Sequence, residues 1–296
     1  MIKITCDSTA DLDQEFQKRD IDFLPLFVTL GDKNYFDGVD ITPPDIFEFV
    51  KKNKILPKTA ARSEEDFYNF FNSYVEKGYE VIHFNISNKF SASFSEAQKA
   101  AERLKGVYVI DSLSLSSGTG LLALYAKDLV DEGKLDAETI YKRCLARIPY
   151  VQASFVVDTM EYLYKGGRCS GVASFMASVL HIKPMILVRD GAMVVGKKYM
   201  GNFDKIILKY VKDMLERFNT PDLTRIFITH TYADEKTVQK VKEEILKIAP
   251  FAEVIATHAG STVTSHCGKN TLGILYINKP VENESSLEQE SSLEQA

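Results

Sequence analysis

Short apolar runs alternate with helical patterns through the first half of the chain, and this alternation limits the fold more than any other feature. The runs that resemble strands are Ile2–Thr5, Ile21–Leu30, Val81–Ile86 and Val107–Ile110. Segments with helical spacing lie between or after them, among them 11–19, 95–104 and 115–130. This order predicts a mostly parallel sheet with helices on both faces.

Two helix starts carry capping signals. Thr42 is followed by two prolines and by Asp45, and Ser63 is followed by Asp66 three positions later. A hydroxyl residue with an acid three residues on forms a capping box, and proline is favoured in a first helical turn. We therefore expect helices to begin directly after Thr42 and Ser63.

The second half of the chain contains the patterns of a β-hairpin and of an apolar helix face. Asp190-Gly191 lies between two apolar runs, which predicts a β-hairpin. Ser170 precedes a helical apolar stripe from Val172 to Leu180. A chain of 296 residues is long enough for two domains. The sequence thus predicts an α/β fold with an N-terminal α/β domain (1–150), a C-terminal α/β domain with a hairpin (151–280) and a disordered tail (281–296), which repeats SSLEQ.

Composition excludes several classes. The net charge is -5 and no basic stripe is evident, which argues against a nucleic-acid binder. No apolar run approaches the roughly 20 residues of a membrane-spanning helix, and the N-terminus lacks a signal-peptide core, so we expect a cytoplasmic protein. The cysteines and histidines lie in no metal-binding spacing, so we expect reduced thiols and no metal site.

Common enzyme motifs are absent: the sequence has no GxSxG elbow, phosphate-binding loop, GxGxxG fingerprint or kinase signature. Two hydroxyl-bearing loops stand out instead, one around Thr59 and one spanning Ser87–Ser93, each before a helix. Free N–H groups and hydroxyls at such positions attract an anion. These loops predict a site for a carboxylate, without cofactor and without catalysis.

The segment from Val157 to Met193 contains Asp158-Thr159, the turn Lys165-Gly166-Gly167-Arg168 and Ile182-Lys183-Pro184. Together with CDSTADL (6–12) and SHCGKNTLGILYI (265–277), this order resembles the DegV family, whose members bind long-chain fatty acids. The resemblance implies that a long-chain fatty acid lies in a buried apolar tunnel with its carboxylate presented at one end.

The resemblance also implies which residues bind the carboxylate. Thr59, Ser91 and His266 match family positions, although Ala92 replaces a family glycine. Ser93 adds a fourth candidate hydroxyl. Ser93 also forms a capping box with Glu96, so its hydroxyl has a second explanation as a helix cap.

A partner is implied as well. Some members of the family serve as the lipid-loaded subunit of a fatty-acid kinase whose ATP-binding subunit phosphorylates the acid. Arg168 matches a basic residue that the resemblance places at the docking surface, while Met200 stands where the family often carries an arginine. The alternative from another class is a stand-alone esterase or thioesterase that uses Ser91 and His266.

Overall fold

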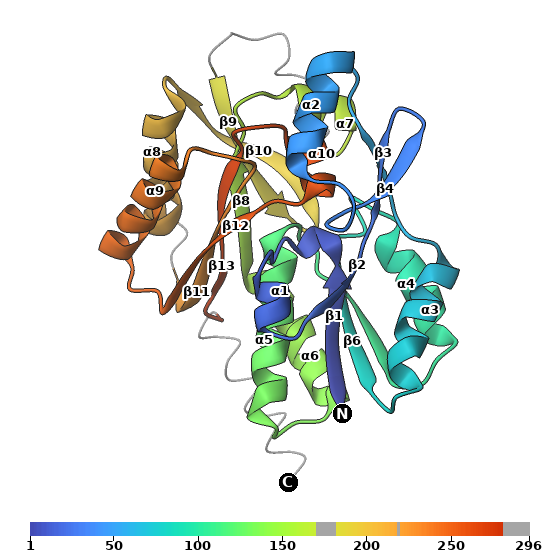
Figure 1. Cartoon of the computed structure of the whole chain (residues 1–296). Coiled ribbons are helices and arrows are strands. Elements are labelled where there is room, and N and C mark those ends of the chain that lie inside the picture. Colours follow the sequence, from blue (N-terminus) through green and yellow to red (C-terminus); the bar gives the residue numbers. More distant parts are fainter. Residues whose placement is uncertain (170–181, 218–219, 281–296) are drawn as a thin grey trace.

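The computed structural model describes residues 1–169, 182–217 and 220–280, and Figure 1 shows their arrangement. The described strands form one four-stranded, one six-stranded and one three-stranded sheet. The α/β class and the parallel N-terminal sheet are confirmed. The predicted helix after Ser170 and the predicted tail 281–296 lie outside the described residues.

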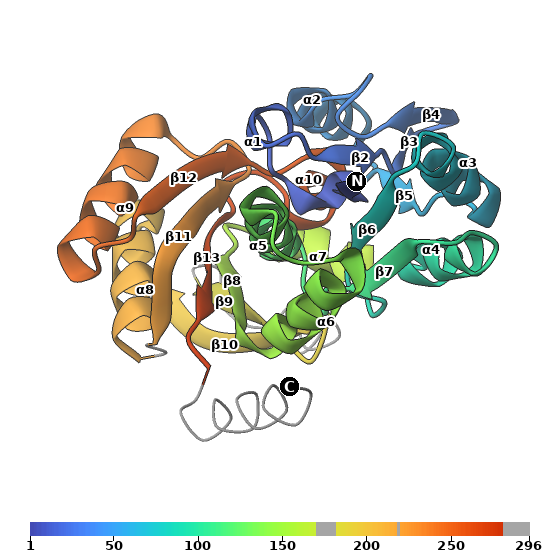
Figure 2. The same cartoon turned by 90° about the horizontal axis from the view of Figure 1, so that it is seen from below.

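The four-stranded sheet has the order β2-β1-β6-β7, and every pair of neighbours is parallel. Its strands are β1 (Ile2–Asp7), β2 (Asp22–Leu24), β6 (Glu80–Asn85) and β7 (Val107–Asp111). Helices α3 (Glu64–Val75) and α4 (Ser93–Glu102) cover one face, and α5 (Ser117–Glu132) and α6 (Ala137–Arg147) cover the other (Figure 2).

The prediction of one strand over Ile21–Leu30 is wrong. Pro25 separates β2 from β3 (Phe27–Leu30), because proline has no N–H group to continue a ladder. β3 instead pairs with β4 (Lys33–Phe36) and β5 (Lys58–Ala60) in a small antiparallel sheet. The expected helix over 11–19 shortens to α1 (Glu15–Lys18), after a 3₁₀ turn at Ser8–Ala10.

The six-stranded sheet is mixed, with the order β10-β9-β8-β13-β11-β12. Its strands are β8 (Val151–Val156), β9 (Ile182–Arg189), β10 (Ala192–Met200), β11 (Pro221–His230), β12 (Glu253–His258) and β13 (Leu272–Asn278). Helices α8 (Phe203–Arg217) and α9 (Glu235–Ile248) cover its outer face (Figure 1). The predicted hairpin is confirmed: Asp190 and Gly191 have φ angles of 49° and 77° at its turn.

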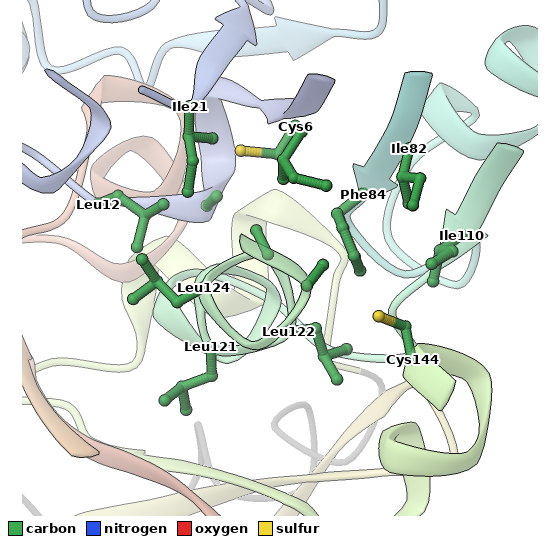
Figure 3. Packing of buried hydrophobic residues seen from close by; sticks show 14 of the residues in the cluster. Cys6, Leu12, Ile21, Ile82, Phe84, Ile110, Leu121, Leu122, Leu124 and Cys144 are labelled. Atoms are coloured by element: carbon green, nitrogen blue, oxygen red, sulfur yellow. The ribbon is translucent and has the colours of Figure 1, made fainter. Parts of the chain in front are cut away.

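Helix α5 lies between the two large sheets (Figure 2). Side chains from β1, β6 and β7 point toward it, as do Leu12 and Ile21 (Figure 3). The same apolar cluster includes Phe227 of β11 and Leu275 of β13. Both sheets therefore share a core through α5. The boundary expected near Tyr150 stays a prediction.

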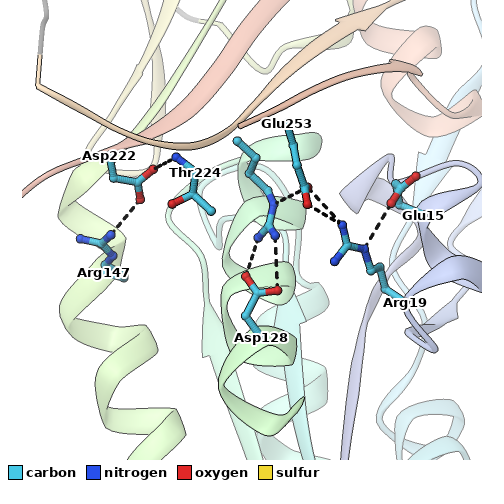
Figure 4. A network of polar contacts seen from close by, with 8 residues as sticks. Glu15, Arg19, Asp128, Arg147, Asp222, Thr224 and Glu253 are labelled. Atoms are coloured by element: carbon cyan, nitrogen blue, oxygen red, sulfur yellow. Dashed lines mark hydrogen bonds and ion pairs between the residues drawn. The ribbon is translucent and has the colours of Figure 1, made fainter. Parts of the chain in front are cut away.

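Ion pairs link the C-terminal part of α5 to β11 and β12 (Figure 4). The guanidinium of Arg225 on β11 lies 2.8 Å from Asp128 of α5 and 3.1 Å from Glu253 of β12. Glu253 also accepts from Arg19 at 2.9 Å, beside α1. Removal of one partner of such a pair would leave the other charge partly buried and unpaired, which is costly.

The remaining described helices are α2 (Pro43–Asn53), α7 (Glu161–Gly166) and α10 (Ser261–Cys267), and the 3₁₀ turn η2 (Ile148–Tyr150) directly precedes β8. The capping boxes expected at Thr42 and Ser63 are both present, the first before α2 and the second before α3. None of the described helices is long and apolar enough to cross a membrane.

Candidate functional site

A cavity of about 430 Å³ opens beyond the carboxyl ends of β6 and β7. Its apolar wall consists of Leu26, Ala60, Ala61, Ile86, Phe90, Ala92, Leu115, Met193, Val263 and Cys267. Its polar atoms come from Thr59, Asn88, Lys89, Ser91, Arg168, Thr262 and His266. The volume falls in the range of roughly 300–1,000 Å³ that is typical of small-molecule sites. An apolar wall with a few hydroxyl and cationic groups suits an amphipathic ligand.

Thr59 and His266 meet at this cavity. Thr59 lies on β5 of the small sheet, and His266 lies in the last turn of α10. Thr59 Oγ1 and His266 Nε2 are 2.8 Å apart. Burial, and to a lesser degree the charge of Arg168, lower the pKa of His266 to about 4. The imidazole is therefore neutral at neutral pH, and its tautomer decides which of the two groups donates.

The other ring nitrogen of His266 lies against a glycine. Its Nδ1 atom is buried without a hydrogen-bond partner among the described residues. A Cβ atom built on Gly166 would lie 2.6 Å from this nitrogen, closer than two such atoms can approach. Gly166, the last residue of α7, therefore makes room for the ring that bonds Thr59.

Ser91 lies in the loop between β6 and α4 and lines the cavity. Its Oγ atom accepts a hydrogen bond from the N–H group of Ser93 at 3.1 Å, and its own N–H group donates to the Ser87 carbonyl at 3.3 Å. Within residues 1–169, 182–217 and 220–280, no protein acceptor is present for the Ser91 hydroxyl proton. Ser91 is thus held in place with its donor available to a ligand.

Ser93 points elsewhere. Its side chain is fully buried, and its hydroxyl donates to the Asp7 carboxylate at 2.9 Å. Asp7 also accepts from the side chain of Asn85 and from the N–H group of Ile86. The capping box expected at Ser93 is wrong, because Ala92 is the N-cap of α4 and makes no side-chain cap. The structure orients Ser93 toward Asp7 and not toward the cavity.

Arg168 follows the turn that ends α7, where Gly167 has a φ angle of 69°. Its guanidinium donates to the Gly166 carbonyl at 2.7 Å. The side chain is exposed and at the same time lines the cavity. The residue expected at a docking surface thus lies at the mouth of the same cavity as Thr59, Ser91 and His266.

Part of the cavity lining comes from residues that the sequence does not indicate. Thr262 and Val263 come from α10, which the sequence did not indicate because β-branched residues favour strands. Asn88 and Lys89 belong to the predicted second loop and were not singled out. The approach of α10 to Thr59 depends on contacts between distant segments, which local patterns do not show.

The surroundings of Ser91 bear on the esterase alternative. His266 Nε2 bonds Thr59, and no hydrogen bond links Ser91 to a base in the part of the chain that the structure describes. A nucleophilic serine needs such a base within hydrogen-bond reach. The four cysteines are buried and form no disulfide bond among the described residues, and burial raises the pKa of the Cys267 thiol to about 12. Cys267 is therefore a wall residue and a poor nucleophile.

Comparisons with known proteins agree on one family. The family model DegV, described as "Uncharacterised protein, DegV family", matches residues 1–279. A DegV domain-containing protein of Clostridium acetobutylicum is 33% identical over 283 residues, which cover 94% of this chain and 99% of the relative.

Solved structures extend this likeness. A DegV family protein from Thermus thermophilus, reported for its fatty-acid binding, is 29% identical with a TM-score of 0.84, and the match covers 94% of this chain and 99% of that one. A stearic acid-binding protein from Eubacterium ventriosum is 27% identical with a TM-score of 0.83 at the same coverage. Both resemble the chain over nearly its whole length.

Proposed function

The chain belongs to the DegV family, and we propose that it binds one long-chain fatty acid in the cavity between its two halves. One observation carries the proposal: the cavity is apolar over most of its wall and presents the Thr59–His266 pair and the Ser91 hydroxyl together. Relatives described as fatty-acid-binding proteins support the same ligand class.

The head group has donors prepared for it. A carboxylate taken out of water must be hydrogen-bonded, because its desolvation is otherwise expensive. Ser91 supplies one hydroxyl. If His266 carries its proton on Nε2, it donates to Thr59, and the Thr59 hydroxyl then donates to the carboxylate. A neutral histidine, two hydroxyls and the nearby Arg168 favour an ionised acid over an alcohol or an ester.

The acyl chain supplies most of the affinity. Burial of one methylene group is worth about 0.8 kcal/mol. About fourteen methylene groups give roughly 11 kcal/mol before the costs of association. Ile86, Phe90 and Leu115 form part of the wall that such a chain contacts. The hydroxyls then fix which end of the ligand lies at the mouth.

The proposed role is that of a carrier without catalytic activity of its own. The carboxylate site lies beside Arg168, which is exposed at the cavity mouth. A separate ATP-binding kinase subunit would phosphorylate the acid there, and Arg168 would contact that partner or the charged product. We place the carrier in the cytoplasm, where ATP is available, and in the phospholipid metabolism that uses activated acids.

Solvent extraction of the purified protein, followed by lipid analysis, tests the proposal. We expect a long-chain acid in the extract, and we expect the delipidated protein to bind oleate or palmitate with a stoichiometry near one. Steady hydrolysis of an acyl thioester that disappears in Ser91→Ala would instead favour the esterase alternative.

A further inference from the structure

We propose that two buried aspartates of the N-terminal half, Asp11 and Asp37, act as positioning residues for His266 by fixing the start of α10. This inference rests on the proposed function, because His266 matters only if the cavity binds an acid. It adds two residues that line no part of the cavity.

The helix they hold is weak by itself. Helix α10 has seven residues, and three consecutive members, Thr262 to Thr264, are β-branched. Isolated helices shorter than about 12 residues are marginal, and β-branched residues lower helix propensity further. Its N-cap is Gly260, which has no side chain to accept from the first turn. The free N–H groups of this turn must find acceptors elsewhere.

Asp11 and Asp37 provide these acceptors. The N–H group of Gly260 donates to Asp11 Oδ1 at 2.8 Å, and that of Ser261 donates to Asp37 Oδ1 at 2.7 Å. The glycine permits this approach, because a Cβ atom there would lie 3.1 Å from Asp37 Oδ1 and 3.2 Å from Asp11 Oδ1. Ser261 is bound a second time through its hydroxyl, which donates to the Ile41 carbonyl at 3.2 Å.

The second oxygen of each carboxylate is anchored in the N-terminal half. Asp37 Oδ2 accepts from the Ser8 hydroxyl at 2.9 Å, and Asp11 Oδ2 accepts from the Ser116 hydroxyl at 2.5 Å. Each aspartate therefore ties the start of α10 to the segment after β1 or to the N-cap of α5. Both side chains are almost fully buried, at 3% and 1% exposure for Asp11 and Asp37.

Two buried acids side by side are costly, which argues for a specific role. Burial raises the pKa of both carboxyl groups, that of Asp11 well above its usual range, and the proximity of Asp37 adds to the effect on Asp11. The four hydrogen bonds to Gly260, Ser261 and the two serines offset part of this cost. A helix end that needed only a cap would be served by one neutral serine at the N-cap position.

Helix α10 connects the two aspartates at its start to His266 at its end. The helix starts at the two aspartates and brings His266, in its last turn, to Thr59 on β5. Both ends of the helix thus contact the N-terminal half, while the helix itself follows β12 of the other half. Loss of the contacts at its start lets α10 shift, and the Thr59–His266 hydrogen bond is the contact that such a shift breaks.

A double-mutant cycle tests this coupling. Oleate affinity is measured by calorimetric titration for the delipidated wild type, Asp37→Ala, His266→Ala and the double variant. We expect Asp37→Ala to weaken binding about tenfold and the double variant to bind no more weakly than His266→Ala alone. Asp37→Asn should restore most of the affinity, because its amide oxygen still accepts from Ser261. Asp13→Ala, an exposed aspartate in the same segment, should change affinity less than about twofold.

The outcomes separate the two proposals. If the wild type binds no oleate, the proposed function fails. If it binds oleate and the effects of Asp37→Ala and His266→Ala multiply, or Asp37→Ala binds like the wild type, the positioning role is refuted. Should Asp37→Ala not fold, Gly260→Ala provides the second route, since its Cβ atom crowds both carboxylates. We expect its effect also to vanish in the His266→Ala background, and a persisting effect would contradict the inference.

Discussion

The Nε2 atom of His266 lies 2.8 Å from the Oγ1 atom of Thr59, and this contact closes the cavity between two segments that are 207 positions apart. It places a neutral base next to a hydroxyl whose other side is free for a ligand. The proposed head-group site depends on this pair more than on any other contact.

Removal of either hydroxyl should weaken binding of the acid. In Ser91→Ala or Thr59→Val the carboxylate is one donor short in a buried site, which costs about 1–3 kcal/mol. Calorimetric titration with oleate measures this loss. Thr29→Val is the matched control, because the hydroxyl of this half-buried threonine on β3 donates to the side chain of Asn34. An equal loss of affinity in the control would place the head group elsewhere.

Gly166 and Gly167 should respond differently to alanine. In Gly166→Ala the new methyl group meets His266 Nδ1 at 2.6 Å, so the ring must move away from Thr59 and oleate affinity should fall. Gly167 has a φ angle of 69° and nothing within 4 Å of the added carbon. Gly167→Ala should therefore lower the free energy of unfolding by about 1 kcal/mol and leave affinity unchanged. Equal affinities for the two variants would argue against the crowding of His266.

The stability of the protein should depend on His266 in a defined pH range. Its pKa is about 4 in the folded protein, against about 6.5 in an unfolded chain. As the pH falls, His266 therefore takes up its proton in the unfolded state before it does so in the folded state. The contribution of His266 to the free energy of unfolding is full above pH 6.5 and is lost as the pH falls toward 4. The contribution is on the order of 3 kcal/mol.

Comparison with His266→Gln isolates this contribution. Glutamine does not titrate and can still bond Thr59. In denaturant unfolding of delipidated protein, the wild type should lose more stability than the variant between pH 6.5 and 4. Parallel curves for the two proteins would show that the imidazole titrates normally and is not buried.

Local patterns predicted those elements whose cause is local. Helices α2 and α3 begin at the capping boxes of Thr42 and Ser63, and the hairpin turn needs two residues with positive φ, which Asp190-Gly191 favours. β1 and β6 are predictable because parallel strands that are buried along most of their length are rich in apolar residues.

The elements that complete the site were not predictable in this way. β5 has only three residues, and its pairing with β3 places Thr59, so its register comes from a neighbour. Helix α10 carries strand-forming residues and is held by Asp11 and Asp37 from distant parts of the chain. Ser93 has the sequence of a capping box, yet the buried carboxylate of Asp7 is the acceptor that its hydroxyl reaches. In each case a long-range contact outweighs the local preference.

Arg168 should matter more for phosphorylation of the bound fatty acid by a kinase subunit than for binding of the fatty acid. It is exposed at the cavity mouth, so Arg168→Gln should reduce oleate affinity only slightly, since the acyl chain supplies most of the binding energy. Acyl-phosphate formation from oleate and ATP, with the kinase subunit of the same organism, should fall strongly. Lys165→Gln, which removes an exposed charge paired with Glu161, is the control. Loss of oleate binding in Arg168→Gln would instead make Arg168 a main carboxylate ligand.

Native mass spectrometry of the protein as purified tests the central claim most directly. We expect a species heavier than the bare chain by the mass of one long-chain fatty acid, and we expect this lipid-bound species to be less abundant in Ser91→Ala and Thr59→Val. A wild-type protein that carries no such mass, and that takes up neither oleate nor palmitate when they are added, would contradict it.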